Sequence, residues 1–563
     1  MAAEVDVLMR RWYVVFGAML IVAGFTSCGI QKSLQDRPDI SAYTVALPEK
    51  HNVNDSTFTQ GKNSLLKNKY GLWELYLEGN PLERGLANGS LTKDLYYRQE
   101  RVFLEKVKSL VPSEGQQKFL SKFLKWYNRK LHKHIPEEYK VEIYGVSRSG
   151  SSTFNDLAPP YLRSLYLHGA HDIGHALQDL MLVGCTSFAV WDDKSEDGKL
   201  LLGRNFDFYA GDDFAQEKIV TFVKPDQGHN FMSVTWGGFI GVVSGMNDQG
   251  LTVTINAGKS KVPLVAKTPI SIVTREILQY AATIAEAVAI AKNRKVFVSE
   301  SILVGSANDG KAALIEVSPN NFGVFEVENS SQLICANHFQ SEAYKKDRRN
   351  SKTIEESHTA YRFDRMAELL QAEEKVNPTE AVAILRNRNG LNNEAIGFGN
   401  EKALNQLLAH HGIVFQPEDN KVWVSANPYQ MGAFVMYDLD EIFNAAEKLK
   451  TISLSEEKET IPASPFLKTE AYKNYEAYRR LEAGVEAHLA AETFTASKNV
   501  EKLVELNPDY WKAHYLAGRY LYEVGKYREA VRYLRLASQK EIPSHDETQL
   551  VAKYLKKATR KAK

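Results

Sequence analysis

The stretch Val183-Gly184-Cys185-Thr186-Ser187-Phe188-Ala189-Val190-Trp191 predicts a β-strand that begins close to a cysteine. Asp197-Gly198 follows as a hairpin turn, and the apolar run after it is typical of a returning strand. The hairpin would bring Arg204 and Asp207 to the sheet end that carries the cysteine. A cation beside a thiol favours the thiolate, and a carboxylate beside an amine holds that amine in place. The pattern therefore predicts an activated cysteine nucleophile, with a small buried core cysteine as the alternative.

Length and composition set the broad class of the protein. A chain of 563 residues is too long for one hydrophobic core, so we expect two or three domains. The composition, 44% hydrophobic and 25% charged, is typical of a globular protein. The formal net charge is +1 and no basic stripe is evident, which argues against nucleic-acid binding. With only 3 cysteines, the chain is not a disulfide scaffold.

The N-terminus has the pattern of an export signal. Arg10-Arg11 precede an apolar run from Trp12 to Phe25, and Thr26-Ser27-Cys28-Gly29 follow it. A charged flank, a short apolar run and small residues predict a secretory signal, and the run is too short for a comfortable membrane span. A cysteine directly after the small residues resembles a bacterial lipoprotein signal. We expect a signal peptide over 1–27, a lipid anchor on Cys28 and a location at the outer membrane or periplasmic face of the cell envelope, with an ordinary secretory signal as the alternative.

Hydrophobic periodicity predicts the rest of the architecture. Residues 28–59 are polar and are expected to form a tether, 60–184 are mostly helical, and 185–450 alternate strands with helical stretches. Sheets interleaved with two helical layers predict an α+β fold, an αββα sandwich. Residues 451–563 are helical, and their small residues are spaced as in one tetratricopeptide (TPR) repeat. For this TPR-like domain we favour a cap docked on the preceding domain over a partner-binding solenoid.

From about Lys67 to Leu449 the chain resembles a known enzyme family. The residues that carry the resemblance are Gly184-Cys185-Thr186, Gly203-Arg204-Asn205-Phe206-Asp207, Asn256 and Asn337-His338-Phe339. They resemble the N-terminal-nucleophile (Ntn) hydrolases of the acyl-CoA:6-aminopenicillanic acid acyltransferase type (peptidase family C45), kin to choloylglycine hydrolase and acid ceramidase. The resemblance implies an Ntn-type sandwich whose precursor cuts itself between Gly184 and Cys185. Gly184 would leave room for the attack, and the new α-amine, with a pKa of about 8, would act as general base for its own thiol.

The resemblance also implies a role for each of the other residues. Asp207 corresponds to the carboxylate that orients the new amine, and Arg204 to the arginine that stabilises the thiolate and binds polar substrate. Asn256 corresponds to an oxyanion-hole donor and Asn337 to a second active-site asparagine. Arg362 matches a later arginine of the family and is a candidate for substrate binding. Taken singly, these positions also fit ordinary structural roles such as a turn residue or a surface ion pair.

The predicted enzyme cleaves the C–N amide bond of an N-acylated small molecule through a Cys185 thioester. We expect no cofactor, and we expect the cleaved N-terminal chain to remain as a tightly associated subunit. Tyr209, Trp236 and Phe239 are candidates for the acyl pocket, although an aromatic run is more often core. Acyl transfer to an amine is the alternative reaction. A non-catalytic envelope lipoprotein that binds a ligand is the alternative of a different class.

A zinc site is a further alternative. His168, His171 and His175 lie on one predicted helix, and His171-Asp172-Ile173-Gly174-His175 imitates the H-E-x-x-H motif with Asp in place of Glu. Asp is a methylene shorter than the Glu that acts as base in that motif, and no third ligand follows at the expected distance. The two interpretations are therefore a zinc hydrolase that uses His171 and His175, and ordinary histidines on a helix surface or in the core.

Overall fold

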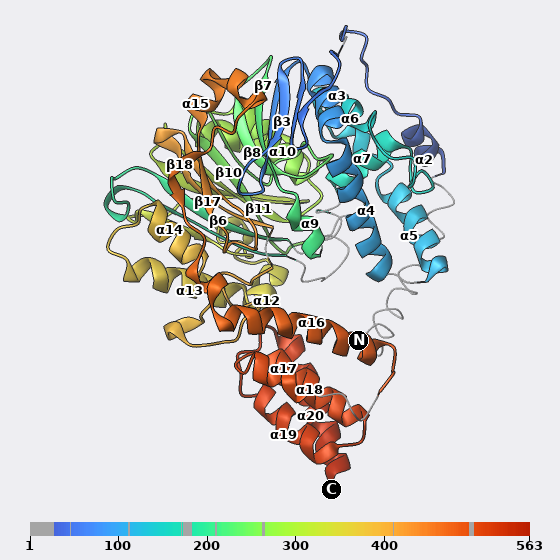
Figure 1. Cartoon of the computed structure of the whole chain (residues 1–563), viewed down its shortest axis with the longest axis vertical. Helices are drawn as coiled ribbons and strands as arrows, with labels where there is room; N and C mark the ends of the chain where they lie inside the picture. The colour runs from blue at the N-terminus through green and yellow to red at the C-terminus, as the bar shows by residue number, and fades with distance from the viewer. Residues whose placement is uncertain are drawn as a thin grey trace.

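Two β-sheets stacked face to face, with helices on both outer faces, make up the centre of the molecule (Figure 1). The computed structural model describes residues 27–45, 47–110, 113–169, 172, 183–208, 211–261, 265–408, 410–494 and 500–563. A group of helices from the N-terminal part lies at one side of the sandwich, and a C-terminal helical extension lies below it. The predicted α+β fold, an αββα sandwich with helical additions at both ends, is confirmed.

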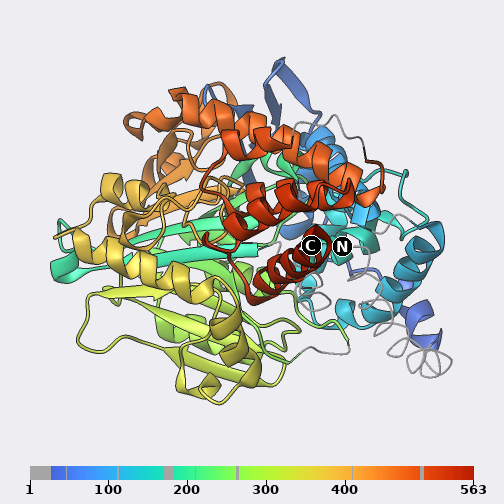
Figure 2. The ribbon, with the colours of Figure 1, turned by 90° about the horizontal axis from the view of Figure 1, so that it is seen from below.

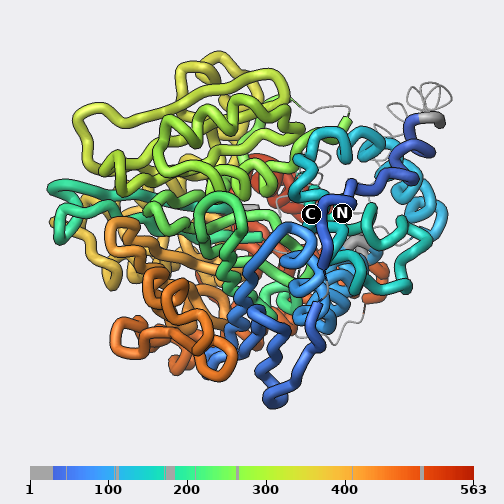
Figure 3. Tube along the Cα trace, turned by 90° about the horizontal axis from the view of Figure 1, so that it is seen from above, coloured from blue at the N-terminus to red at the C-terminus, as the bar shows by residue number. Residues whose placement is uncertain are grey.

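The larger sheet takes its first strands from the N-terminal part of the chain. Its order is β1 (His51–Asn54), β2 (Thr57–Gln60), β3 (Asn63–Lys67), β4 (Trp73–Gly79), β7 (Ile219–Pro225), β8 (Phe231–Thr235), β9 (Ser244–Asn247), β10 (Leu251–Ala257), β11 (Glu300–Ser306), β12 (Lys311–Ser318) and β13 (Asn321–Phe325). Strand β4 pairs with β7 in parallel, from Trp73 opposite Ile219 to Gly79 opposite Pro225. Figure 3 shows this blue N-terminal trace running beside the green strands. The segment before Cys185 is thus built into the sheet.

The smaller sheet carries the predicted cysteine strand and its hairpin partner. Its order is β14 (Gln332–Cys335), β5 (Val183–Val190), β6 (Leu201–Phe208), β15 (His411–Gln416), β16 (Lys421–Ser425), β17 (Phe434–Asp438) and β18 (Glu456–Ile461). Strands β5 and β6 are antiparallel, with Gly198 at φ +78° in the turn between them. This is the hairpin that Asp197-Gly198 predicts.

Alternation along the strands decides which side chains meet between the sheets. In β5, Ala189 lies in the core between the two sheets, whereas Phe188 and Val190 pack against helices on the outer face. Successive side chains of a strand point to opposite faces, so Cys185 and Ser187 also face the larger sheet. Helices α10 (Ile270–Tyr280) and α11 (Ile284–Asn293) cover the outer face of the larger sheet, and α13 (Thr359–Ala372) and α14 (Pro378–Leu385) cover that of the smaller one.

The N-terminal helices form a cluster of their own beside the larger sheet. They are α2 (Ser27–Leu34), α3 (Pro81–Leu91), α4 (Lys93–Leu110), α5 (Glu114–Tyr127), α6 (Glu137–Ser147) and α7 (Pro160–His168). A buried ion cluster joins them to the sandwich, because the Glu142 carboxylate of α6 accepts from Arg84 of α3 at 2.8 Å and from Arg275 of α10 at 3.2 Å. The α5, α6 and α7 side chains also share a hydrophobic cluster with Ile272 of α10. Strand pairing, ion pairs and apolar packing therefore all hold this part of the chain.

The C-terminal extension is docked on the sandwich. It consists of α16 (Glu470–Ala490), α17 (Glu501–Leu506), α18 (Trp511–Glu523), α19 (Tyr527–Ala537) and α20 (His545–Ala562), which lie across one end of the molecule in Figure 2. Leu407 and Met431 of the sandwich belong to its hydrophobic cluster. A Cβ on Gly397 would lie 2.4 Å from the Cα of Tyr510, so the two parts are in close contact. This arrangement agrees with the cap that we favoured, and the repeat type stays a prediction.

Three predicted segments contain elements that the sequence did not predict. The expected tether, 28–59, contains α2 and β1 and most of β2, and the expected helical segment, 60–184, contains β3 and β4. Strand β18 lies within 451–563, where only helices were expected. Strands β1 and β18 stand at sheet edges and bury few side chains, so main-chain hydrogen bonds hold them and hydropathy does not reveal them. Residues 1–26 lie outside the described residues, and no helix in the part that is described has the length and hydropathy to cross a bilayer.

Candidate active site

The β5–β6 hairpin sets an arginine against the cysteine thiol. Ser187 pairs with Arg204 across the hairpin, and Cys185 lies one alternation further along the same face. The Arg204 Nη2 donates to the Cys185 Sγ over 3.6 Å. The two predicted residues are therefore brought together, in the space between the sheets.

Burial dominates the protonation of this thiol. Cys185 is 1% exposed and belongs to the same hydrophobic cluster as Phe206 and Phe239. Burial raises the pKa of the thiol to about 11, although the charges of Arg204 and Arg362 oppose the rise. In the uncleaved chain the thiol is therefore neutral at pH 7. The expectation that the arginine alone would favour a thiolate is corrected to this extent, because desolvation outweighs the cation.

Arg204 is anchored to the larger sheet as well as to the thiol. Its Nη1 donates to the main-chain oxygen of Val243 at 3.0 Å and to the Ser244 hydroxyl, and its Nη2 donates to the main-chain oxygen of Ile255. The guanidinium carbon also lies 4.3 Å from the centroid of the Phe206 ring. A side chain with this many acceptors has one orientation, and that orientation points at the sulfur.

A second arginine holds the main chain of Cys185. Arg362, on α13, donates from Nη1 to the Cys185 main-chain oxygen at 2.8 Å and from Nη2 to Asn337 Oδ1 at 2.6 Å. Asn337 Oδ1 also accepts from the Cys185 N–H at 3.1 Å. That N–H belongs to the peptide bond between Gly184 and Cys185. Arg362 and Asn337 therefore fix the cysteine backbone on both sides of its Cα.

Asp207 lies beside the same peptide bond. It pairs with Gly184 across the hairpin, and its Oδ1 accepts from Gln430 Nε2 at 3.3 Å. Its Oδ2 has no hydrogen-bond partner among the described residues. Burial raises the pKa of this carboxyl to about 7, against the lowering effects of Arg362, Gln430 and Arg204. An amine formed at Cys185 would find a nearby acceptor here.

Asn256 is close to the site, but its amide is already occupied. Its Oδ1 accepts from the Ser187 hydroxyl at 2.9 Å, and its Nδ2 donates to the main-chain oxygens of Cys335 at 3.1 Å and Ala336 at 3.4 Å. In the uncleaved chain this amide therefore links β10 to β5 and β14. Its predicted role as an oxyanion donor stays a prediction, and it requires release of one of these two bonds.

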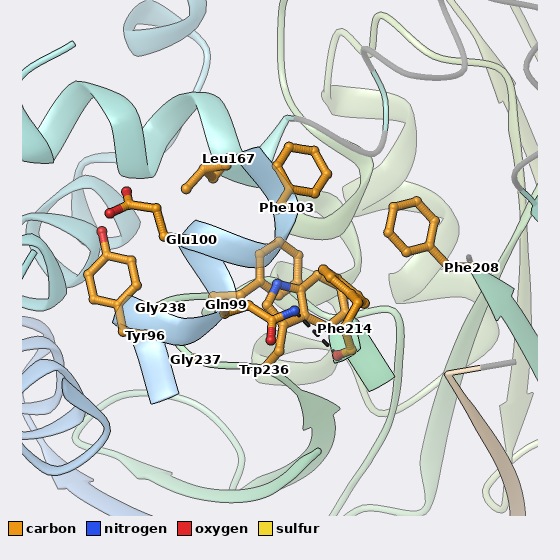
Figure 4. A pocket seen from close by; sticks show the side chains of 11 residues that line it. Tyr96, Gln99, Glu100, Phe103, Leu167, Phe208, Phe214, Trp236, Gly237 and Gly238 are labelled. Atoms are coloured by element: carbon orange, nitrogen blue, oxygen red, sulfur yellow. Dashed lines mark hydrogen bonds between the residues drawn. The ribbon is translucent and has the colours of Figure 1, made fainter. Parts of the chain in front are cut away.

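Figure 4 shows an aromatic pocket formed by side chains from both sides of the cysteine in sequence. Its walls are formed by Tyr96, Gln99, Glu100, Phe103, Leu167, Phe208, Phe214, Trp236, Gly237, Gly238 and Phe239. Trp236 and Phe239 are stacked with ring centroids 4.4 Å apart, and both belong to or pack against the hydrophobic cluster that contains Cys185. Two of the three predicted pocket residues thus line it. Tyr209 lies outside the described residues.

The histidines of the zinc alternative are only partly within the described chain. His171 and His175 lie outside it, whereas His168 is a core residue. The His168 Nδ1 is 2.7 Å from the Ser164 main-chain oxygen, its Nε2 accepts from the Ile240 N–H at 3.0 Å, and its ring stacks on Phe239. Both ring nitrogens are engaged, so His168 is not available as a ligand. In the part of the chain that the structure describes, no group of three or more His, Cys, Asp or Glu is placed to hold a metal.

Sequence reasoning assigned no role to several residues that contact the site. They are Thr186, His358 and Gln430, which contact Arg362 or Asp207, and Ser244 and His411, which stand behind Arg204. The adjacent His410-His411 pair, directly before an apolar strand, is the one signal that was present in the sequence. Gln430 lies in a loop and gave no signal.

Part of the chain is similar to known proteins. Residues 193–428 match the family model described as acyl-coenzyme A:6-aminopenicillanic acid acyl-transferase. The match begins just after Cys185 and includes the positions of Arg204, Asp207, Asn256, Asn337 and Arg362. An uncharacterized protein of Archaeoglobus fulgidus is 27% identical over 279 residues, and the aligned part covers 45% of this chain and 45% of that protein. The chain thus spans less than half the length of this relative.

Two solved structures are also similar to the chain. The Caenorhabditis elegans orthologue of N-acylethanolamine-hydrolyzing acid amidase is 19% identical with a TM-score of 0.31, covering 42% of this chain and 93% of that one. A mutant conjugated bile acid hydrolase from Clostridium perfringens is 13% identical with a TM-score of 0.30, covering 48% of this chain and 96% of that one. Residues 193–428 of this chain are thus similar to an acyl-transferase family, over less than half of the chain.

Proposed function

We propose that this protein is a self-cleaving cysteine amidohydrolase whose nucleophile is Cys185. The observation that carries the proposal is the arrangement around one residue: Arg204 lies 3.6 Å from the Cys185 sulfur, while Asn337 and Arg362 hold its main chain. A structural core cysteine needs neither a guanidinium at its sulfur nor a side-chain acceptor on its N–H. The same arrangement argues against the non-catalytic lipoprotein alternative. The zinc alternative depends on His171 and His175, which lie outside the described residues.

The first step would break the Gly184–Cys185 peptide bond. The Cys185 Sγ attacks the Gly184 carbonyl carbon, the C–N bond breaks, and the thiol proton ends on the departing nitrogen. This leaves a thioester on Cys185 and a free α-amine on the same residue. Water then hydrolyses the thioester, which releases the Gly184 carboxylate and regenerates the thiol. Asp207, whose Oδ2 accepts no hydrogen bond from the described residues, would receive the new ammonium group.

The mature site would repeat this chemistry on a substrate amide. The α-amine takes the thiol proton, the thiolate attacks the acyl carbonyl, and the departing amine leaves with that proton. Arg204 stabilises the thiolate from one side of the sulfur. Hydrolysis of the acyl thioester by water completes the cycle, and capture by a second amine would give acyl transfer in its place.

The pocket indicates what the acyl group resembles. Phe208, Phe214, Trp236 and Phe239 present a mainly apolar wall, with Gln99 and Glu100 among the polar lining groups. Phe239 belongs to the hydrophobic cluster that contains Cys185, and Phe208 and Trp236 pack against that cluster. We therefore propose an N-acyl amide with an apolar acyl group as the substrate class. We also propose that the enzyme is exported and lipid-anchored through Cys28, so that it works at the cell envelope.

The proposal is tested by comparing wild-type protein with Cys185→Ala on a denaturing gel. We expect wild-type protein to give two fragments that meet at Gly184–Cys185 and to hydrolyse members of an N-acyl amide series, and we expect Cys185→Ala to stay intact and inactive. Mass spectrometry of the second fragment should find Cys185 as its first residue. An intact wild-type chain that still binds a substrate analogue would favour the binding-protein alternative. Metal analysis and activity after chelation decide the zinc alternative.

A further inference from the structure

A row of buried polar side chains continues from Arg204 away from the thiol. The Arg204 Nη1 donates to the Ser244 hydroxyl on β9 of the larger sheet. Ser244 Oγ lies 2.9 Å from His411 Nε2, at the start of β15, and His411 Nδ1 lies 2.9 Å from His410 Nδ1. All four side chains are buried, at 0–1% exposure. The row crosses from the smaller sheet to the larger one and back.

The directions of the hydrogen bonds in this row follow from the arginine together with the partners of the Ser244 hydroxyl. A guanidinium carries only donors, so Ser244 Oγ accepts from Arg204. The contact with His411 is the other hydrogen bond of this hydroxyl among the described residues, and we assign the hydroxyl proton to it because the buried O–H would otherwise face no acceptor. His411 Nε2 is therefore the acceptor, and the His411 proton sits on Nδ1, from which it donates to His410 Nδ1. The His410 proton then sits on Nε2, a buried atom without a hydrogen-bond partner among the described residues. Both histidines are neutral, each in one defined tautomer.

The surroundings keep the histidine pair neutral. Besides burial, the positive charges of Arg204 and Lys218 lower the pKa of His410 and of His411, and neither histidine has a carboxylate among the groups that shift it. Lys218 is itself fully buried, and its Nζ has no hydrogen-bond partner among the described residues. Burial lowers the pKa of Lys218 to about 7, so a proton added to either ring would place a positive charge beside the Arg204 guanidinium and beside an amine that is itself costly to charge.

The far end of the row touches the aromatic pocket. The His410 ring packs edge-on against Phe214 and Trp236, with centroid distances of 5.7 and 5.4 Å, and against Phe206 at 6.2 Å. Phe214 and Trp236 line the pocket, and Phe206 lies under the Arg204 guanidinium. The wall of the pocket and the thiol are thus connected through a continuous set of packed and hydrogen-bonded groups.

We propose that Ser244, His411 and His410 are positioning residues that hold the Arg204 guanidinium against the Cys185 thiol. This inference rests on the proposed function, because it assigns these residues to the self-cleavage and amide cleavage described above. None of the three touches the sulfur. They act through Arg204. The two histidines hold the Ser244 hydroxyl in place, and this hydroxyl accepts from Arg204 Nη1 and so helps to fix the orientation of the guanidinium. Without Ser244 Oγ, the guanidinium would keep two main-chain acceptors and gain freedom to turn away from the thiol.

The matched substitutions are Ser244→Ala and Thr254→Val in the full-length chain. Thr254 pairs with Ser244 across β9 and β10, is equally buried, and has a hydroxyl without a hydrogen-bond partner among the described residues. We expect Ser244→Ala to slow the first-order rate of self-cleavage by about tenfold or more, since it removes a hydrogen bond to a charged group. Thr254→Val should cleave at the wild-type rate, with both variants melting within a few degrees of each other.

Two variants of His411 separate positioning from packing. His411→Gln retains an acceptor within reach of the Ser244 hydroxyl and should recover most of the rate, whereas His411→Leu fills the space and should not. An equal loss in both, or a Ser244→Ala rate within twofold of wild type, would overturn the proposal. So would an equal loss in Thr254→Val.

The histidine tautomers give a readout that does not depend on cleavage. Nitrogen-15 NMR of histidine-labelled protein should show His411 protonated on Nδ1 and His410 on Nε2, with signals assigned by their loss in His411→Gln and in His410→Gln. If wild-type protein does not cleave itself but these tautomers are found, the proposed function fails and the arrangement stands. If the protein cleaves itself and His411 is protonated on Nε2, the positioning proposal is wrong and the function stands.

Discussion

Replacing Gly184 with alanine tests whether the residue before the nucleophile is confined by its neighbours. A Cβ at this position would lie 2.6 Å from Gln406 Nε2 and 3.3 Å from Gln406 Cδ and Oε1. Ordinary contacts begin near 3.4 Å, so the buried Gln406 side chain has to move. That movement would break its hydrogen bond to the Glu401 main-chain oxygen at 3.2 Å. The clash comes from a side chain and not from main chain, so a second substitution can relieve it.

The size of the effect follows from these two contributions. Overpacking a filled site costs about 1–3 kcal/mol, and losing one buried hydrogen bond costs about 1 kcal/mol. We therefore expect Gly184→Ala to lower the free energy of unfolding by about 2–4 kcal/mol. Gln406→Ala alone loses the hydrogen bond and some packing. In the double variant the methyl group occupies the vacated space, so the two effects should differ from additivity by about 1–3 kcal/mol.

The assay uses chemical unfolding in a Cys185→Ala background, which keeps every variant as one chain. The four proteins of this double-mutant cycle are the background, Gly184→Ala, Gln406→Ala and the double variant. The free energy of unfolding of the sandwich is measured for each. The same pair of substitutions is then placed in the Cys185 protein to measure the rate of self-cleavage. Partial recovery of that rate in the double variant means that Gln406 obstructs the alanine. Additive stabilities, or a Gly184→Ala protein as stable as its background, would refute the steric reasoning.

Three further outcomes follow from the site. Arg362→Lys should slow self-cleavage by about tenfold to hundredfold, because a lysine cannot serve both the Cys185 carbonyl and the other acceptors of the guanidinium, whereas Arg365→Lys, a buried arginine on the same helix with other partners, should cleave normally on the same gel assay. Because burial raises the pKa of Asp207 to about 7, the folded state binds its proton more tightly than the unfolded state, and the stability that this proton gives declines as the pH rises from about 4 through 7. In the uncleaved Cys185→Ala background, Asp207→Asn should therefore melt at a higher temperature than its parent at pH 8, with the difference shrinking towards pH 4, and a difference that grows at acid pH would contradict this. Trp236→Ala should raise the KM for amides with bulky apolar acyl groups about tenfold and change that for acetyl amides little, and a uniform loss across an acyl-length series would exclude the pocket as the acyl site.

The sequence predicted the cysteine hairpin because its signals are local. A Gly turn between two apolar runs fixes the pairing of β5 with β6, and that pairing alone places Arg204 on the face of Cys185 and Asp207 opposite Gly184. The same locality explains why burial of the thiol was underestimated. Its surroundings come from segments that are distant in sequence, among them β10 and the loop that carries Phe239, and their combined desolvation outweighs the charges of Arg204 and Arg362.

Long-range partners were the part that the sequence did not predict. Ser244 and His411 meet Arg204 only because two sheets stack, and Gln430 reaches Asp207 from a loop more than two hundred positions away. Strand β1 was missed for a different reason, because an edge strand with exposed side chains has no hydrophobic pattern to detect. In each case the stabilising contact is made by the assembled fold.

The order of strands also explains how the chain would survive its own cleavage. The parallel pairing of β4 with β7 and the Glu142–Arg275 ion pair join residues before Gly184 to residues after Cys185. Neither contact depends on the Gly184–Cys185 peptide bond. Cutting that bond would therefore free only the new chain ends at Gly184 and Cys185. The new amino group, however, would change the electrostatics of the site strongly. A new ammonium beside Asp207 would lower the pKa of that carboxyl and of the Cys185 thiol, both of which burial holds high in the intact chain. In the intact chain the Cys185 nitrogen belongs to a peptide bond and cannot take the thiol proton, whereas after cleavage the α-amine takes that proton and the ammonium so formed stabilises the thiolate.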